Sequence, residues 1–147
     1  MLTEFRHIGI VVNDLDVSLH FYRDLLGLKV LKQMEEGGKF IDKVLGLQDI
    51  RVTTVKMGFG QSTLIELLYY HRLPRKDENS IKGICVNGLT HIAFTVKNLE
   101  ETYGRLKKHG VGFVSDPEIS PDRYAKVTFC KDPEGNFIEL VEVLNGK

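Results

Sequence analysis

One pattern occurs twice in this chain, and the repeat constrains the fold more than any other feature. The segment His7–Leu15 reads HIGIVVNDL, and the segment His91–Leu99 reads HIAFTVKNL. Each half also has a later segment centred on a glutamate, Leu64–Leu68 (LIELL) in the first and Phe137–Val141 (FIELV) in the second. A period this long is typical of two copies of one supersecondary module and too long for a solenoid. We therefore expect two modules related by a pseudo-twofold axis.

Local patterns predict the same order of elements, β-α-β-β-β, in both halves. Alternating apolar residues indicate strands. A helical spacing of leucines and tyrosines follows a capping signal, Asn13-Asp14 or Asn98, and ends at Gly27 or Gly110. In the first half we expect strands at Phe5–Val12, Leu28–Met34, Arg51–Met57 and Thr63–Tyr70, with a short helical turn at Phe40–Leu45. In the second half we expect strands at Leu89–Val96, Val111–Val114, Tyr124–Lys131 and Asn136–Val143, with a tight turn at Asp132–Gly135.

These elements predict an α+β fold in which the sheets of two tandem β-α-β-β-β modules form a shared cup. The expected organisation is a single domain over residues 1–147, with module one at about 1–70, a linker at about 71–88 and module two at about 89–147. The linker is polar and carries Pro74.

Composition excludes several classes of function. Lys plus Arg equals Asp plus Glu at 20 each, so no net field attracts nucleic acid or an anionic membrane. No apolar run approaches the roughly 20 residues that span a bilayer, and the N-terminus lacks the apolar segment of a signal peptide. Cys85 and Cys130 form no disulfide framework. We therefore expect a cytoplasmic protein with reduced thiols.

The repeat singles out four candidate metal ligands: His7, Glu66, His91 and Glu139. Alone, a histidine or glutamate in a strand usually has a structural or solvated role, but both types recur here at matching places. The two glutamates lie in otherwise apolar strands, where an unpaired carboxylate is costly. Imidazole and carboxylate together suit zinc, nickel, cobalt, manganese or iron. The other histidines, His20, His71 and His109, have no counterpart in the repeat, which favours solvent or helix-end roles.

The paired modules, the His-Ile-x-x-x-Val strands, the Asp132–Asn136 turn and the Ile-Glu-Leu strands resemble the vicinal oxygen chelate superfamily over roughly residues 5 to 143. That superfamily includes glyoxalase I, methylmalonyl-CoA epimerase, extradiol dioxygenases, and fosfomycin and bleomycin resistance proteins. The resemblance implies one divalent metal held by His7, Glu66, His91 and Glu139, and a substrate that chelates it through neighbouring oxygens. It also implies a proton transfer through a metal-bound enediolate, with Glu139 as the first choice of base and Glu66 as the second.

Departures from the pattern narrow the choice of relative. Glyoxalase I that acts on glutathione adducts carries an arginine and an asparagine where this chain has Val11 and Tyr70. Extradiol dioxygenases carry a tyrosine where this chain has Phe129. Epimerases carry a Gly-Ala-His-Gly-like loop where this chain has Ser120–Lys126.

We therefore expect a lactoylglutathione lyase-like or epimerase-like enzyme that acts on a small 2-oxo or 2-oxo-acyl substrate. The alternatives are a non-catalytic small-molecule binding protein of the drug-resistance type and an iron-dependent extradiol-type dioxygenase. A homodimer is expected, and the modules either pair within one chain or are exchanged between two.

Two features bear on the substrate. Six cations are candidates for binding a substrate carboxylate or phosphate: Arg51, Lys56, Arg72, Arg75, Arg123 and Lys126. Residues 36–49 contain several glycines and are the candidate lid.

Overall fold

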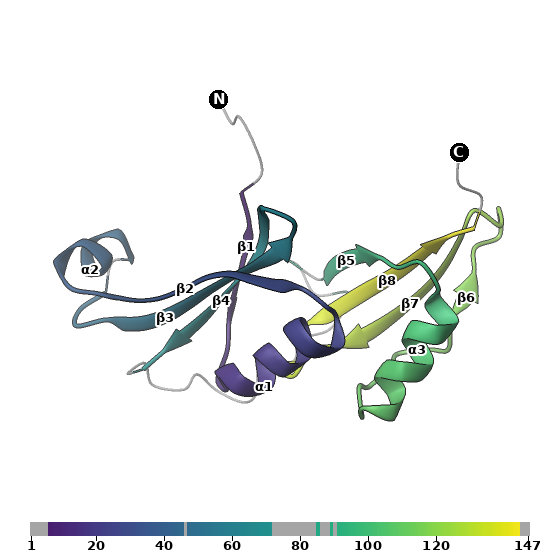
Figure 1. Ribbon diagram of the computed structural model, residues 1–147, viewed down its shortest axis with the longest axis horizontal. Helices are drawn as coiled ribbons and strands as arrows, with labels where there is room; N and C mark the ends of the chain where they lie inside the picture. Colours follow the sequence, from purple (N-terminus) through teal and green to yellow (C-terminus); the bar gives the residue numbers. More distant parts are fainter. Residues whose placement is uncertain (1–5, 46, 72–84, 86–88, 90, 145–147) are drawn as a thin grey trace. The chain divides into compact units, whose positions relative to one another are not determined.

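A computed structural model of the chain describes residues 6–45, 47–71, 85, 89 and 91–144. The chain divides into two compact units, Met1–Glu78 and Asn79–Lys147, at a boundary within the expected linker. Each unit contains one four-stranded mixed sheet (Figure 1). The prediction of an α+β fold with a repeated module is therefore confirmed. Among the described residues, no helix is long and apolar enough to cross a membrane.

The first sheet has the strand order β1-β4-β3-β2, and its first strand runs parallel to its last. The strands are β1 (Ile8–Val11), β2 (Lys29–Gly37), β3 (Arg51–Phe59) and β4 (Ser62–Tyr70). The helices are α1 (Leu15–Leu19), the π-helix η1 (His20–Leu25) and α2 (Lys39–Leu45). The expected strand from Phe5 begins at Ile8, and residues 1–5 lie outside the described part of the chain.

The helix after β1 begins and ends where the sequence predicts, although its second half is of a different type. Asp14 caps it by accepting a hydrogen bond from the backbone N–H of Val17 at 3.0 Å. After α1 the hydrogen bonds widen to the π pattern, as in the bond from the N–H of Leu26 to the carbonyl of Phe21 at 3.0 Å. Gly27 then takes a φ of 80°, which a glycine adopts without strain.

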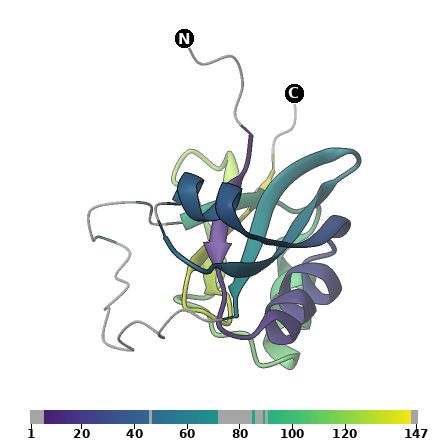
Figure 2. The ribbon, with the colours of Figure 1, turned by 90° about the vertical axis from the view of Figure 1, so that its left-hand side faces the viewer.

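Helices α1 and η1 lie along one face of the first sheet, and α2 follows directly after the end of β2 (Figures 1 and 2). Helix residues Tyr22 and Leu25 are buried, as are Ile65 and Leu67 of β4. Because side chains alternate along a strand, the residues between them, Glu66 among these, point from the other face. We call this other surface the open face, and the surface under the helix the helix face.

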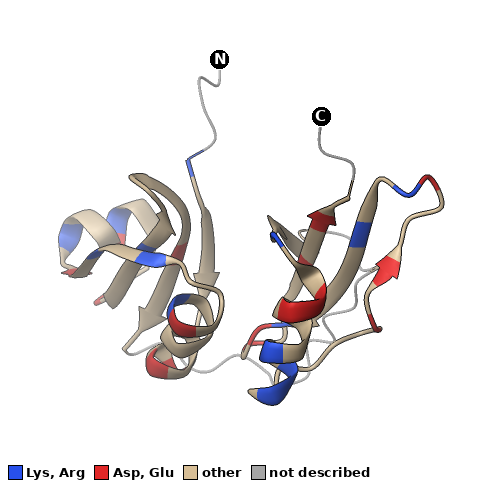
Figure 3. Ribbon diagram, turned by 45° about the vertical axis from the view of Figure 1, so that its right-hand side comes forward, with Lys and Arg blue, Asp and Glu red and all other residues tan. Residues whose placement is uncertain are grey.

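The second sheet repeats this design with the order β5-β8-β7-β6. Its elements are β5 (His91–Thr95), α3 (Leu99–Lys108), β6 (Glu118–Ile119), β7 (Ala125–Lys131) and β8 (Phe137–Val143). Asn98 caps α3 by accepting from the N–H of Glu101 at 3.0 Å, as predicted. Acidic residues lie in the first turn of α3 and basic residues in the last, which complements the helix dipole (Figure 3).

The expected strand at Val111–Val114 is wrong. Phe113 forms a single bridge to Cys130, and the edge strand β6 begins only at Glu118. The reason lies in the residues on either side. The N–H of Val111 bonds to the carbonyl of Leu106 and so belongs to the end of α3, while Pro117 has no N–H to give to a ladder.

The turn between β7 and β8 is organised by the buried Asp132. Its carboxylate accepts from the N–H groups of Glu134 and Asn136 at 3.0 and 2.7 Å, and from the Asn136 side chain at 2.8 Å. Gly135 completes the turn with a φ of 80°. This network fixes the start of the strand that carries Glu139.

Two glycine substitutions are expected to change stability in opposite directions. A Cβ at Gly58 would lie 1.9 Å from the carbonyl oxygen of Ser62, so Gly58→Ala must displace the β3–β4 hairpin and should cost about 2 kcal/mol of unfolding free energy. A Cβ at Gly104 meets nothing within 4 Å, so Gly104→Ala in α3 should add up to about 1 kcal/mol. Urea unfolding measures the change in unfolding free energy for both variants. Equal changes would contradict the close packing of Gly58 against Ser62 in the hairpin.

The two cysteines are expected to differ in reactivity. Burial, followed by the charge of Asp132, raises the pKa of the Cys130 thiol to about 12, so this thiol stays protonated at pH 8. Cys85 is exposed. A thiol reagent at pH 8 should therefore label one site rapidly in the folded protein and the second only after unfolding. Cys85→Ser should remove the rapid phase, and a rapid phase that survives in this variant would contradict the burial of Cys130.

Candidate functional site

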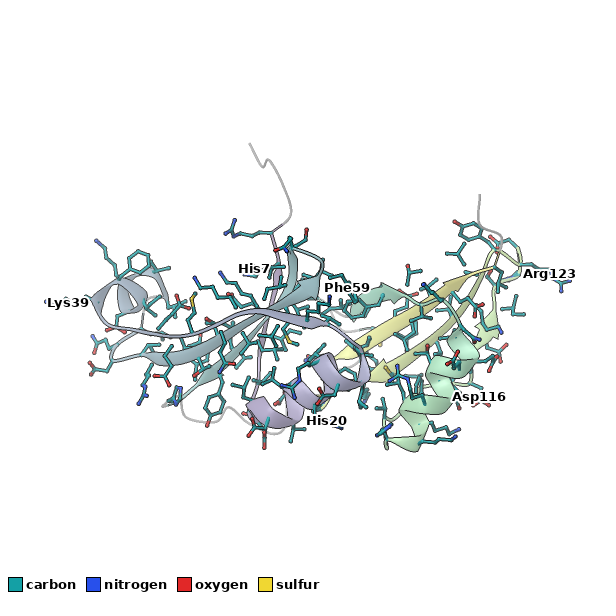
Figure 4. All side chains as sticks on the ribbon, in the orientation of Figure 1. His7, His20, Lys39, Phe59, Asp116 and Arg123 are labelled. Carbon is teal, nitrogen blue, oxygen red and sulfur yellow. The ribbon has the colours of Figure 1, made fainter. Side chains whose placement is uncertain are left out.

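In the first unit, His7 and Glu66 form a pair on the open face of the sheet. Strands β1 and β4 run parallel with Gly9 opposite Glu66, and His7 stands one residue before β1. The Nε2 atom of His7 lies 3.2 Å from Oε2 of Glu66, and the Glu66 side chain is only 14% exposed. Figure 4 shows His7 at the start of β1 and His20 on the helix. The structure thus joins the first two residues that the sequence singles out.

In the second unit, His91 and Glu139 repeat the arrangement. Strands β5 and β8 run parallel with Ala93 opposite Glu139, as Gly9 is opposite Glu66. The Nε2 atom of His91 lies 3.3 Å from Oε2 of Glu139. The flanking residues of β8, Ile138 and Leu140, are buried on the helix face. Both units therefore present the same histidine–glutamate pair from the open face of a sheet.

The two pairs differ in the residue that lies beside each glutamate on the next strand. Lys56 of β3 is in register with Glu66, and its Nζ atom lies 3.7 Å from Oε1 of that residue. Phe129 of β7 is in register with Glu139, and its ring packs edge-on against His91 at 5.4 Å between centroids. In sequence alone Lys56 is one of six candidate cations, and the antiparallel register singles it out.

The other candidate cations have different positions. Arg51 pairs with Glu35 at 2.8 Å, and Lys126 pairs with Glu100 of α3 at 3.1 Å. Lys126 is in register with Glu142 and so lies on the helix face, away from Glu139. Arg123 lies in the turn before β7 with a φ of 57°, and Arg72 and Arg75 lie outside the described residues.

Glu142 is a structural residue that sequence reasoning missed. Its Oε2 atom accepts from the N–H of Leu99, the first residue of α3, at 2.8 Å. Strand alternation puts it on the helix face, three residues from Glu139. The sequence contained a signal for this: Glu142 is an odd number of residues after Glu139, and residues so spaced in a strand lie on opposite faces.

The histidines without a counterpart in the repeat have local partners. His20 lies on η1 with its Nδ1 atom 3.1 Å from Asp24, and His109 is the residue that ends α3. The Nε2 atom of His71 lies 2.8 Å from the hydroxyl of Thr53, next to the ring of Tyr69. None of these contacts involves the two histidine–glutamate pairs.

The donors present fit a divalent cation of the first transition row. Each pair offers one imidazole nitrogen and carboxylate oxygens within 3.3 Å, and both are ligand types that such metals accept. Within the described part of the chain, no group of three or more His, Cys, Asp and Glu side chains is gathered. Each unit by itself thus supplies two donors, half of a four-ligand site.

Two further expectations concern the surroundings of the first pair. The candidate lid at residues 36–49 contains α2, whose residues Phe40 and Val44 are exposed. Val11 and Tyr70 stand at the ends of β1 and β4, where Val11 is exposed and Tyr70 half-buried. Neither residue offers the guanidinium or amide that a glutathione adduct is expected to meet.

Comparison with known proteins shows the family of the chain. Residues 4–140 match the model of the glyoxalase/bleomycin resistance protein/dioxygenase superfamily. The chain is 28% identical to a probable lactoylglutathione lyase from Synechocystis, over 96% of both chains. It is 30% identical to a lactoylglutathione lyase from Pseudomonas aeruginosa, over 97% of this chain and 85% of the relative.

A solved structure extends the comparison to the fold. The crystal structure of a glyoxalase family protein from Bacillus cereus has a TM-score of 0.88 and 25% identity, and the match covers 99% of this chain and 97% of the other. The repeated sheet with parallel first and last strands, the two histidine–glutamate pairs and the match over nearly all of the sequence lead to one conclusion. The chain belongs to the glyoxalase/bleomycin resistance protein/dioxygenase superfamily, the vicinal oxygen chelate proteins.

Proposed function

We propose that the protein is a divalent-metal enzyme of the glyoxalase and epimerase type. It isomerises or epimerises a small 2-oxo or 2-oxo-acyl substrate by moving a proton on the carbon next to the carbonyl. The observation that carries the proposal is the recurrence of one pair in both units, at 3.2 Å between His7 and Glu66 and 3.3 Å between His91 and Glu139. Lactoylglutathione lyases among the relatives support a lyase or isomerase.

In this proposal the two pairs hold one metal ion between them. His7 and Glu66 supply two ligands, and His91 and Glu139 supply the other two. The ion is zinc, nickel, cobalt, manganese or iron, and when bound it would polarise two neighbouring substrate oxygens and acidify the adjacent carbon-bound proton. The ligands come either from one chain or from two chains of a homodimer that exchange modules.

Glu139 is the proposed base, and the surroundings of the two glutamates support this choice. Among the described residues, the Glu139 carboxylate pairs with His91, whereas Glu66 pairs with both His7 and Lys56. A carboxylate with fewer partners is more easily released to accept a proton. Glu139 would take the proton from the reacting carbon and, in an isomerisation, deliver it to the neighbouring carbon; in an epimerisation the proton would have to return to the opposite face of the same carbon. Glu66 is the second candidate for the base.

A glutathione adduct is disfavoured as the substrate in this proposal. The exposed Val11 and the half-buried Tyr70 replace the two polar contacts expected for that adduct. The extradiol dioxygenase alternative is disfavoured by Phe129, because its ring packs on His91 and carries no hydroxyl for acid–base chemistry.

Metal content is the first test of the proposal. Protein purified without chelators should contain about one metal ion for each set of four ligands. His7→Ala and His91→Ala should each weaken metal binding by at least about a hundredfold, because loss of a ligand should exceed the 10- to 100-fold cost of losing a residue that only supports one. Elemental analysis and competition with a chromogenic chelator measure both quantities.

His20→Ala is the matched control for these variants, since His20 is an exposed histidine whose partner is Asp24. It should retain metal at the wild-type level. Absence of metal from all four proteins, even after incubation with zinc, nickel, manganese and iron, would rule out the enzyme and favour the small-molecule binding protein.

Catalysis is tested by exchange of the substrate's carbon-bound proton in D₂O, followed by NMR across a panel of 2-oxo compounds. Glu139→Gln should slow exchange by roughly 10² to 10⁴, the usual contribution of a general base, while the folded spectrum is retained. Glu118→Gln, an exposed change on β6, should leave the rate unchanged. Exchange at the wild-type rate in Glu139→Gln would exclude Glu139 as the base.

A further inference from the structure

Lys56 breaks the symmetry between the two halves of the candidate site. The position beside the pair's glutamate holds an ammonium group in the first unit and the ring of Phe129 in the second. In the proposed function only the two histidine–glutamate pairs hold the metal. The second unit provides its pair with no cation at the position beside Glu139. Lys56 is therefore a point at which the two units differ in charge beside the same histidine–glutamate pair.

The position of Lys56 is set by the sheet, so its charge is aimed at the site. It lies in β3 between the buried Val55 and Met57, and the register places it on the open face opposite Glu66. Its side chain is 26% exposed, which is low for a lysine, since lysines are almost never buried unless paired. Among the described residues, Glu66 is the carboxylate found within 4 Å of its ammonium group.

Metal binding would change what this ammonium group faces. Glu66 now divides its oxygens, with Oε2 toward His7 and Oε1 toward Lys56. When Glu66 and His7 act as ligands, the carboxylate charge is shared with a dication, and a fixed ammonium group nearby is repelled by that dication. A second negative charge, brought by the substrate, would offset this repulsion.

We propose that Lys56 binds an anionic group of the substrate, an inference that rests on the proposed metal site. The substrate class is then a 2-oxo compound that carries a carboxylate or a phosphate besides the two oxygens that chelate the metal. An ammonium group binds a carboxylate or a phosphate as a point charge. The position of Lys56 therefore indicates an anionic group and does not distinguish between the two.

Three compounds that share the same metal-chelating group, a hydroxamate, test this inference. Their affinities for the metal-loaded protein are measured by calorimetry. Acetohydroxamate has no further charge, succinate monohydroxamate adds a carboxylate, and phosphonoacetohydroxamate adds a phosphonate. Wild-type protein should bind one of the charged compounds about tenfold more tightly than acetohydroxamate, as expected for one charge-assisted contact. The preferred compound distinguishes a carboxylate substrate from a phosphate substrate.

Variants assign the preference to Lys56. Lys56→Met keeps the length of the side chain and should abolish the preference, while acetohydroxamate binding stays within about twofold. Lys56→Arg should retain most of the preference. Lys126→Met, which removes the same charge from the helix face of the other unit, should leave the preference intact.

Binding of the metal alone gives an independent readout. Because Lys56 competes for Glu66, Lys56→Met should bind zinc severalfold more tightly than wild-type protein. A preference that survives in Lys56→Met, or charged and uncharged hydroxamates bound equally by wild-type protein, would overturn the inference and leave the metal site standing. Failure of acetohydroxamate to bind metal-loaded wild-type protein would instead contradict the proposed function, and the inference with it.

Discussion

The parallel pairing of the first and last strand in each unit is the constraint on which the candidate site depends. In a parallel pair the residues opposite each other share a face, and here the glutamate of the last strand faces a glycine or alanine of the first. The histidine two positions earlier lies on the same face, and its Nε2 atom lies 3.2 Å from the glutamate in the first unit and 3.3 Å in the second. The repeat of the histidine and the glutamate in sequence is therefore a repeat of one contact in space.

Burial on the helix face makes this contact specific. Ile65 and Leu67 flank Glu66, Ile138 and Leu140 flank Glu139, and all four apolar residues are buried. A shift of either strand by one residue would put its glutamate under the helix and expose two apolar side chains. The core thus sets the register, and the register directs each carboxylate to its histidine.

Much of this follows from sequence because the signals are local and occur twice. Asp14, Asn98, Gly27 and Gly110 mark the ends of the helices, and the repetition singled out the four candidate ligands. The strand at Val111–Val114 failed because an end-of-helix hydrogen bond and a proline compete with sheet pairing, and hydrophobicity reports neither. The choice of Lys56 and the role of Glu142 needed the register between strands, which depends on where a hairpin turns and on its bulge at Gly58.

The two halves differ beside their histidine–glutamate pairs, and the proposal about the substrate rests on this difference. The histidine and the glutamate occur in both units, so these positions do not distinguish one half from the other. The neighbouring position on the next strand does, because there one half has a lysine and the other a phenylalanine. The candidate ligands lie on β4, β5 and β8 and directly before β1, while β3 and β7 carry the two residues, Lys56 and Phe129, by which the pairs differ.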